Sequence, residues 1–408
     1  MKTRILITHI SQTLNYGSAM MALNLISRMK PLLPDAEIYC ECDDYNLDRL
    51  KVGTGVHDLK KFDALFNTKL TPITKVKRYI FGSDESIKKI TDNFDVLIVL
   101  GGDDLSETYK KGALLKGSVY KSINKKCKVI LAGQSFGPFF GTTRTMVKNF
   151  YKDISIITRD DNSYEFSKSI GIKKLVKSRD LAMMTLPNQK EFGKILENYP
   201  ELQPNKYFTM VPSGLWHKYT EDKEGYIKTW KKLILNLSKR FPDFKFVILG
   251  HVLAPAKSDD RFVIKEIEKS MAPEERENLI FITEAIQPAE ARQILGGSLM
   301  VITGRMHAAV STFFMKKPAI SLAYSEKYAG VIGRGLELPD LIVESRNQTW
   351  GDQSPLLEEV DKKISYVLEN HEPLTAKISN KIDECTKLVE DQIDFIVSEV
   401  IHSDKIPA

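Results

Sequence analysis

Short apolar runs recur along the chain, and most of them lead through glycine or polar residues into a segment with helical periodicity. The runs lie at 4–8, 36–41, 95–100, 128–132, 154–158, 207–211, 244–249, 279–283, 298–302, 318–323 and 340–344. Apolar runs of this length are typical of strands buried on both faces, and their alternation with helices predicts a parallel sheet. Open parallel sheets bind ligands at the carboxyl ends of their strands, so functional residues are expected there.

Two such sheets are expected, because 408 residues exceed an ordinary single domain. Polarity rises and three prolines occur between residues 187 and 204, which marks a domain boundary. We predict an α/β fold with two Rossmann-like, doubly wound domains at 1–195 and 204–370 that face each other across a cleft, a glycosyltransferase-B-like architecture. An apolar stripe over 374–402 predicts a long C-terminal helix that packs back on the N-terminal domain.

The composition favours a cytoplasmic protein, and its charge suits anionic substrates and an anionic membrane face equally well. The net charge of +6 is a mild excess, and no aromatic-interleaved basic patch points to nucleic acid. The four cysteines lack zinc-like spacing, so no metal site is predicted. Apolar runs are too short to span a membrane, which leaves at most peripheral contact at its inner face. The basic section 75–78 is interpreted as a solvated face, with docking on anionic lipid as the alternative.

In the C-terminal half, the run 298–302 leads through Gly304 to Arg305 and His307 at the start of a predicted helix. Arginine offers a planar pair of donors to phosphate or carboxylate, and histidine moves a proton near neutral pH. A helix N-terminus also favours anions. The alternative is a surface arginine and an ordinary core histidine. Ser213 lies at the end of the run 207–211 and is a further candidate for ligand binding.

In the N-terminal half, polar residues follow four of the predicted strands. Those at strand ends offer carboxylates, an amide, hydroxyls and a guanidinium, and ordinary helix capping is the alternative explanation for several of them. The candidates are Asn15, Gly17, Ser18, Gly102, Asp103, Asp104, Gln134, Ser135 and Arg159.

Taken in order, the motifs resemble those of the polysaccharide pyruvyl transferase family. They are Asn15-Tyr16-Gly17, Gly101-Gly102-Asp103, Gly133-Gln134-Ser135-Phe136-Gly137-Pro138, Arg159-Asp160-x-x-Ser163, Asp180-Leu181-Ala182, Gly304-Arg305-Met306-His307-Ala308 and Tyr324-x-x-Lys327. The resemblance extends from about residue 5 to 335, and its most specific parts are Arg-x-His, Tyr-x-x-Lys and Gly-Gln-x-x-Gly-Pro. The chain departs from the family at Asp103, often a third glycine, and at Leu181, often a proline.

The resemblance implies transfer of the pyruvyl group of phosphoenolpyruvate onto two hydroxyls of a sugar in a cell-surface or exopolysaccharide precursor. The products are a cyclic ketal and phosphate. Phosphoenolpyruvate is a co-substrate held by the C-terminal domain, and no cofactor is expected. The N-terminal domain holds the sugar acceptor, which is lipid-linked or nucleotide-linked.

The same resemblance associates Arg305 and His307 with the donor and with catalysis, and a mechanism follows from it as a hypothesis. Arg305 binds the phosphate or carboxylate of phosphoenolpyruvate, Lys327 is a second cation, and Gly304 and Tyr324 belong to the same substrate-binding motifs. His307 acts as general acid on the methylene carbon. Asp103 or Asp104 takes the proton of the attacking hydroxyl.

Two other functions stay open. One is a nucleotide-sugar glycosyltransferase of the same architecture. Retaining members of that group tend to carry a second glutamate eight residues after a first, but position 334, eight after Glu326, is an arginine. The other is a non-catalytic relative that binds a sugar or an anion, which would not need both Arg305 and His307.

Overall fold

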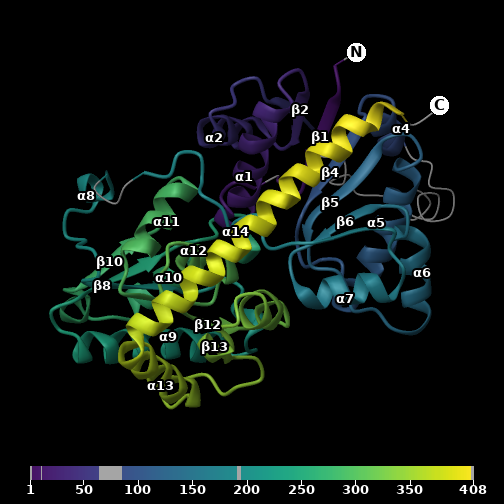
Figure 1. Ribbon diagram of the computed structural model, residues 1–408. Coiled ribbons are helices and arrows are strands. Elements are labelled where there is room, and N and C mark those ends of the chain that lie inside the picture. The colour runs from purple at the N-terminus through teal and green to yellow at the C-terminus, as the bar shows by residue number, and fades with distance from the viewer. Residues whose placement is uncertain (1, 11, 64–84, 191–193, 406–408) are drawn as a thin grey trace. The chain divides into compact units, whose positions relative to one another are not determined.

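The computed structural model describes residues 2–10, 12–63, 85–190 and 194–405, so the basic section 75–78 lies outside the described residues. By its contacts the chain forms two compact units (Figure 1). Unit 1 comprises residues up to 13, residues 21–181 and residues from 385 onward. Unit 2 comprises 14–20 and 182–384. The short segment 14–20 therefore belongs with the C-terminal sheet, although the sequence places it inside the predicted domain 1–195.

Unit 1 contains a seven-stranded parallel sheet in the order β3-β2-β1-β4-β5-β6-β7. Its strands are β1 (Arg4–Thr8), β2 (Glu37–Glu41), β3 (Lys60–Phe62), β4 (Val96–Leu100), β5 (Lys128–Gln134), β6 (Ser155–Thr158) and β7 (Lys174–Lys177). Its helices are α2 (Asp44–Thr54), α4 (Glu85–Thr91), α5 (Lys110–Ile123), α6 (Gly141–Tyr151) and α7 (Asp161–Ser169). The helix α1 (Tyr16–Leu32) begins in unit 2 and continues in unit 1. The strand order reverses between β1 and β4, which is the usual place for a ligand in such sheets.

Unit 2 contains a six-stranded parallel sheet in the order β10-β9-β8-β11-β12-β13, which reverses between β8 and β11. Its strands are β8 (Tyr207–Val211), β9 (Lys245–Leu249), β10 (Leu279–Ile282), β11 (Met300–Thr303), β12 (Ala319–Ala323) and β13 (Ile342–Glu344). Its helices are α8 (Ile195–Asn198), α9 (Lys223–Arg240), α10 (Asp260–Lys269), α11 (Pro288–Gly297), α12 (Met306–Phe314) and α13 (Pro355–Glu369). The predicted fold class, two Rossmann-like parallel-sheet units, is confirmed.

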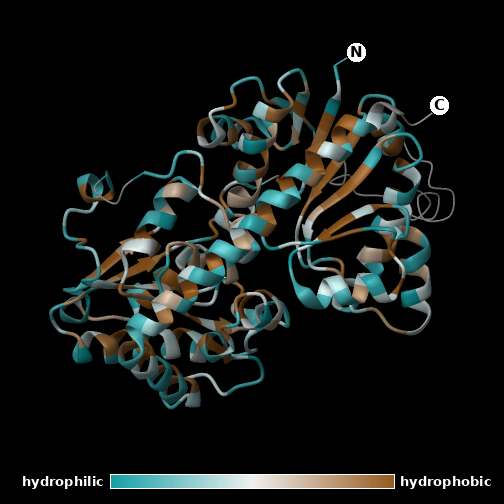
Figure 2. Ribbon diagram, in the orientation of Figure 1, coloured by the Kyte–Doolittle hydropathy of each residue, from teal (hydrophilic) through white to brown (hydrophobic). Residues whose placement is uncertain are grey.

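The cores of both units lie along the central strands. Every residue of β4 and of β11 is buried, and the strands carry the strongest hydrophobic colour (Figure 2). Helices cover both faces of a doubly wound parallel sheet, so its inner strands lack the apolar–polar alternation of a half-exposed strand. The predicted strands were recognisable for this reason. All four cysteines are buried thiols.

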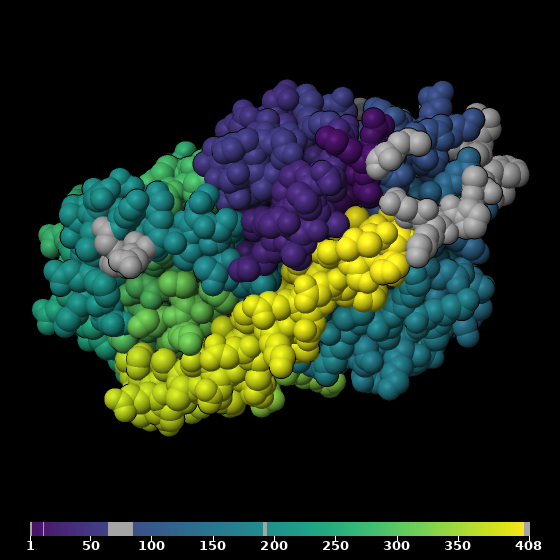
Figure 3. Space-filling model, turned by 45° about the horizontal axis from the view of Figure 1, so that its top comes forward, coloured from purple at the N-terminus to yellow at the C-terminus, as the bar shows by residue number. Residues whose placement is uncertain are grey.

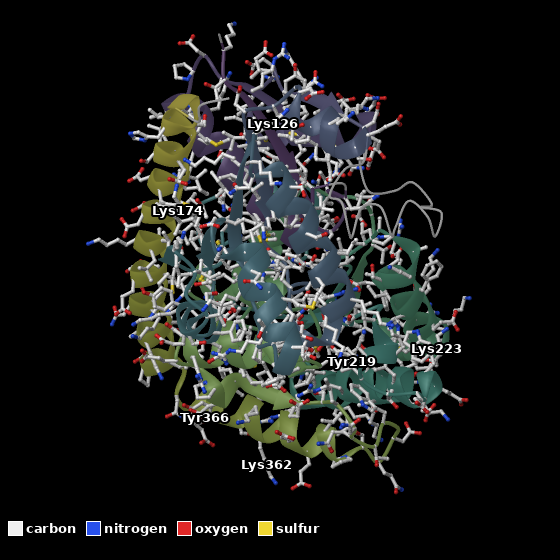
Figure 4. The ribbon with its side chains drawn as sticks, turned by 90° about the vertical axis from the view of Figure 1, so that its right-hand side faces the viewer. Lys126, Lys174, Tyr219, Lys223, Lys362 and Tyr366 are labelled. Carbon is white, nitrogen blue, oxygen red and sulfur yellow. The ribbon has the colours of Figure 1, made fainter. Side chains whose placement is uncertain are left out.

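The long C-terminal helix is α14 (His371–Ile401), which lies on the surface in yellow in Figure 3. Its part from Cys385 onward belongs to unit 1. There Glu399 accepts hydrogen bonds from Ser155 Oγ at 2.5 Å and forms an ion pair with Lys128 at 3.1 Å. Lys174, at the start of β7, is a second cation 3.3 Å from the same carboxylate (Figure 4). None of the described helices has both the length and the apolar character needed to cross a membrane.

Candidate active site

The reversal point of the sheet in unit 2 is built around the backbone of Gly304, directly after β11. A Cβ at this position would lie 2.7 Å from Tyr219 Oη and 3.0 Å from Ser213 Cβ, so a side chain has no room. Tyr219 Oη donates a hydrogen bond to the Gly304 carbonyl oxygen at 2.6 Å, and Tyr328 Oη donates to the same oxygen at 2.8 Å. Both tyrosines are buried, and Figure 4 labels Tyr219 within the fold. They fix the path by which the chain enters α12.

Arg305 is the residue that precedes the first turn of α12, and its side chain is buried. Its Nε and Nη2 atoms lie 3.0 and 2.6 Å from Asp260 Oδ1, and Nη2 also donates to the carbonyl oxygen of Ser258. Burial alone would lower the pKa of Arg305, but the Asp260 carboxylate outweighs it and raises the pKa. The remaining nitrogen, Nη1, makes no hydrogen bond with any described residue and is the part of the guanidinium left to meet a ligand.

Asp260 connects three strand ends and was not among the residues predicted for the site. Besides Arg305, its carboxylate accepts backbone N–H groups from Gly214 at 2.7 Å, His251 at 3.0 Å and Val252 at 2.8 Å. These residues follow β8 and β9, whereas Arg305 follows β11. The residue is fully buried at the start of α10, where Asp259 supplies the helix cap. In the sequence both aspartates are typical of residues at a helix start. The contacts of Asp260 with three strand ends could therefore not be predicted without the fold.

His307 is the second residue of α12, and its ring is half-buried against the start of α1. A Cβ on Gly17 would lie 2.5 Å from the imidazole, so the glycine is what allows the ring to stand there. The predicted residues Asn15, Gly17 and Ser18 thus join His307 in unit 2.

The segment 14–20 is held at the end of β9. Asn15 forms a bridge with Val252, Tyr16 N donates to the His251 carbonyl at 3.2 Å, and Leu253 N donates to the Leu14 carbonyl at 2.8 Å. The side chain of Asn15 accepts from Ser18 N at 3.4 Å, which caps the start of α1.

His251 is a second histidine of this sheet edge that the sequence had not marked as a site residue. It is 1% exposed, and its ring lies edge-on to Tyr16 with 5.5 Å between centroids. Burial lowers the pKa of His251 well below its usual value, and the charges of His307, Arg305 and Arg292 lower it further. The imidazole is therefore neutral near pH 7. Its place directly after Gly250 at a strand end is the signal that could have singled it out.

Tyr324 and Lys327 follow β12, the neighbour of β11 in the sheet. Lys327 Nζ donates to Tyr324 Oη at 2.7 Å and lies 4.6 Å from the centroid of that ring. The Tyr324 ring packs edge-on against Tyr219 and Tyr328, with centroids 5.2 and 5.5 Å away. The lysine is half-buried, and its ammonium group packs on the Tyr324 ring. Ser213, in contrast, is fully buried, and its hydroxyl accepts from Leu215 N at 3.2 Å within its own turn.

In unit 1 the ends of β4 and β5 carry a second group of predicted residues. A Cβ on Gly101 would lie 1.9 Å from the Gly133 carbonyl oxygen, so the two glycine turns touch. Gln134 Nε2 donates to the Gly102 carbonyl and to Asp104 Oδ1, each at 3.1 Å. Asp104 also pairs with Lys116 of α5.

The electrostatics of this group set the two aspartates apart. Burial favours a higher pKa for Asp104, but the charge that His9 carries when protonated, the charge of Lys116 and two hydrogen bonds outweigh it, and the pKa is lowered. A carboxylate held in this way is a weak base. Asp103 is half-buried beside it, and its backbone carbonyl accepts from Ser106 Oγ at 3.3 Å.

Arg159 and Ser135 form an internal network between the ends of β5, β6 and β7. Arg159 is 2% exposed, and its Nη1 lies 2.8 Å from Asp180 Oδ2. Its Nε donates to Ser135 Oγ at 2.8 Å, and Ser135 Oγ donates to Asp160 Oδ2 at 3.0 Å. The structure therefore gives both residues protein partners that stabilise this edge of the sheet.

The predicted residues thus gather in two places rather than one. Asn15, Gly17, Ser18, Ser213, Gly304, Arg305, His307, Tyr324 and Lys327 lie in unit 2, and Gly102, Asp103, Asp104, Gln134, Ser135 and Arg159 lie in unit 1. Among the described residues, no group of three or more His, Cys, Asp and Glu side chains is arranged to hold a metal ion.

Solved structures of other proteins share this fold. UDP-GlcNAc 2-epimerase from Neisseria meningitidis, bound to UDP-GlcNAc, is similar with a TM-score of 0.59 at 15% identity, over 96% of this chain and 99% of that one. A glycosyltransferase from Rickettsia africae is similar with a TM-score of 0.59 at 14% identity, over 98% of this chain and 99% of that one. At these identities the likeness concerns the fold, which is glycosyltransferase-B-like.

The family follows from the sequence match. The family model described as polysaccharide pyruvyl transferase matches residues 15–326, and the chain belongs to this family. The amylovoran biosynthesis protein AmsJ of Erwinia amylovora is 20% identical over 314 residues, which cover 74% of this chain and 72% of AmsJ. The predicted family and the class of enzyme, a transferase, are confirmed.

Proposed function

We propose that this protein transfers the pyruvyl group of phosphoenolpyruvate to two hydroxyls of a sugar, forming a cyclic ketal and releasing phosphate. The sugar belongs to a cell-surface or exopolysaccharide precursor, carried on a lipid or a nucleotide. Family membership supports the pyruvyl transfer. The observation that carries the proposal is the grouping of a guanidinium, an imidazole and an ammonium, from Arg305, His307 and Lys327, after the adjacent strands β11 and β12.

The anionic donor would meet more than one source of positive potential at this edge. The charge of Arg305 is compensated by Asp260 at 2.6 Å. Arg305 would therefore help to bind the donor mainly by orienting it through a hydrogen bond from Nη1, and less by its net charge. Lys327 and the positive N-terminal end of the α12 dipole therefore carry a larger share of the attraction for phosphate and carboxylate.

The chemistry needs one proton delivered to carbon. In the proposed reaction His307 protonates the methylene carbon of phosphoenolpyruvate while positive charge develops at C2, and a sugar hydroxyl forms a C–O bond there. A second hydroxyl then displaces phosphate from the same carbon. Of the two hydroxyl protons released, one restores the imidazolium and the other leaves with the phosphate, so the ketal and phosphate are the only products. His307 stands half-buried at a helix start, which suits a group that must reach both ligand and solvent.

The test is phosphate release from phosphoenolpyruvate in the presence of a panel of free, nucleotide-linked and lipid-linked sugars. We expect phosphate release that depends on one of the acceptors, and a loss of about 100-fold or more in turnover for His307→Ala, with phosphoenolpyruvate binding retained. Turnover of a nucleotide sugar in place of phosphoenolpyruvate would contradict the proposal and favour a glycosyltransferase. Turnover of His307→Ala at the wild-type rate would contradict its role as the acid.

A further inference from the structure

His9, directly after β1, has a left-handed backbone conformation. Its φ of 67° lies in the left-handed region, which costs free energy for any residue with a side chain. The other described non-glycine residues with such a backbone are all exposed loop residues: Asn205, Lys316, Glu337 and Asn347. His9 is half-buried and lies beside the reversal point of the sheet in unit 1. Strain held at such a place is typical of a functional residue.

The imidazole of His9 meets Lys116 and the Leu100 backbone. His9 Nε2 lies 3.5 Å from Lys116 Nζ, at the outer limit of a hydrogen bond, and the ring also bonds to the Leu100 backbone. Lys116 is bound much more closely to Asp104. The lone pair of Nε2 is therefore held only loosely by the lysine and stays open to a better donor.

Gln134 provides a second, independent observation that favours a ligand hydroxyl at this end of the sheet. The side chain is fully buried, and its Nε2 is fixed by Asp104 and the Gly102 carbonyl. Its Oε1 atom has no hydrogen-bond partner among the described residues. A buried acceptor without a donor is costly, and a ligand hydroxyl would supply the missing hydrogen bond.

We propose that His9 is the catalytic base that accepts the proton of the attacking sugar hydroxyl, and that Gln134 Oε1 accepts a hydrogen bond from another hydroxyl of the same sugar. This inference rests on the proposed pyruvyl transfer. As the hydroxyl oxygen reacts, its proton passes to Nε2 of the neutral imidazole, and the imidazolium releases the proton to solvent before the next turnover.

The charges around His9 agree with this role. Burial lowers the pKa of His9, Lys116 lowers it further, and Asp104 and the Leu100 hydrogen bond oppose the shift, so the ring is neutral at pH 7 and can accept a proton. The imidazolium that forms is stabilised by Asp104. Asp104 itself, with its lowered pKa and its bonds to Lys116 and Gln134, is the poorer base.

The experiment compares His9→Gly and His9→Asn with the control Lys316→Gly. Glycine relieves the left-handed strain at both positions, so neither glycine variant should have a lower unfolding midpoint than the wild type. We expect both His9 variants to lose about 100-fold or more of kcat for pyruvyl transfer, with phosphoenolpyruvate binding unchanged, and Lys316→Gly to keep full activity. Imidazole added to His9→Gly should restore part of the lost kcat, because it can enter the space left by the side chain.

The outcomes separate this inference from the proposed function. A wild-type protein that releases no phosphate from phosphoenolpyruvate with any sugar overturns both. An active wild type with fully active His9 variants overturns the inference alone. So does a His9→Gly variant that is folded and inactive but gains nothing from imidazole, because a base would be replaceable whereas a purely structural side chain would not.

Discussion

The two sheets are built alike at their reversal points, yet the ion pairs beside them differ in kind. Each has a glycine with no room for a side chain directly after the central strand, Gly101 in unit 1 and Gly304 in unit 2. Each has an aspartate paired with a cation. Asp260 is fully buried and accepts three backbone N–H groups besides Arg305, whereas Asp104 is half-buried and bonds to the side chains of Lys116 and Gln134.

A charged pair at a strand end can therefore stabilise the fold or take part in the chemistry. Which of the two it does depends on how many of its hydrogen-bonding groups already have partners within the protein. In unit 2 the pair is closed, and in the proposed reaction the chemistry is carried by His307 and Lys327 of the same unit. In unit 1 the pair is open, and we propose that it tunes the neighbouring His9. Each of the following experiments tests one side of this contrast.

The largest effect is expected for Asp260→Ala. The substitution leaves the Arg305 guanidinium and three backbone N–H groups buried without their acceptor, so the free energy of unfolding should fall by about 3–5 kcal/mol. Chemical denaturation measures it. The matched control is Asp259→Ala, which removes a helix cap and the ion pair with the part-exposed Arg261 and should cost about 1–2 kcal/mol. Equal losses in the two variants would mean that Asp260 does not join the strand ends.

Gly17→Ala tests how tightly His307 is placed. The new methyl group would lie 2.5 Å from the imidazole and push it aside, and a displacement of this size should lower kcat by about 100-fold. Steady-state kinetics with phosphoenolpyruvate measures it. Gly112→Ala is the control, because a Cβ there meets nothing within 4 Å and the residue lies inside α5. That variant should be fully active, and a fully active Gly17→Ala would show that the ring position does not matter.

Lys327→Met tests the contribution of the ammonium group that bonds to Tyr324. Methionine keeps most of the packing on Tyr324 but removes the ammonium, so the KM for phosphoenolpyruvate should rise by about 10-fold with a smaller change in kcat. The effect should shrink at high salt. If KM is unchanged, the anion is held by Arg305 and the start of α12 alone.

The smallest effects concern the open pair in unit 1. Because Lys116 lowers the pKa of His9 and Asp104 raises it, Lys116→Met and Asp104→Asn should move that pKa in opposite directions. A base is active when deprotonated, so the acidic limb of the kcat/KM profile should move to higher pH in Lys116→Met and to lower pH in Asp104→Asn. Shifts of the same sign in both variants would remove His9 from the pH profile.

The sequence predicted most of the fold because buried parallel strands leave uninterrupted apolar runs, as at 95–100 and 298–302. It missed β3, since Lys60–Phe62 is short and mostly exposed and pairs only along one edge. A local apolar pattern reveals a strand that is buried along its whole length. It does not reveal a short, exposed edge strand, which is ordered by its hydrogen bonds to the neighbouring strand.

The site was predicted less completely, because its contacts join segments far apart in the chain. Arg305 and His307 were recognisable at a strand-to-helix turn, but the bond from Arg305 to Asp260 spans 45 residues. The contact of Gly17 with His307 spans the chain from α1 to α12. His9 carries no sequence signal at all, since its left-handed backbone and its neighbour Lys116 follow from the fold alone.

The central claim is that His307 delivers a proton to the methylene carbon of phosphoenolpyruvate while two sugar oxygens bond to C2. The most direct test is the reaction in D₂O, with the product analysed by mass spectrometry and NMR. The account predicts a ketal whose methyl group carries one deuterium, formed in equal amount with phosphate, and almost none of it from His307→Ala. A product that keeps the methylene group, or a methyl group without solvent deuterium, would contradict it.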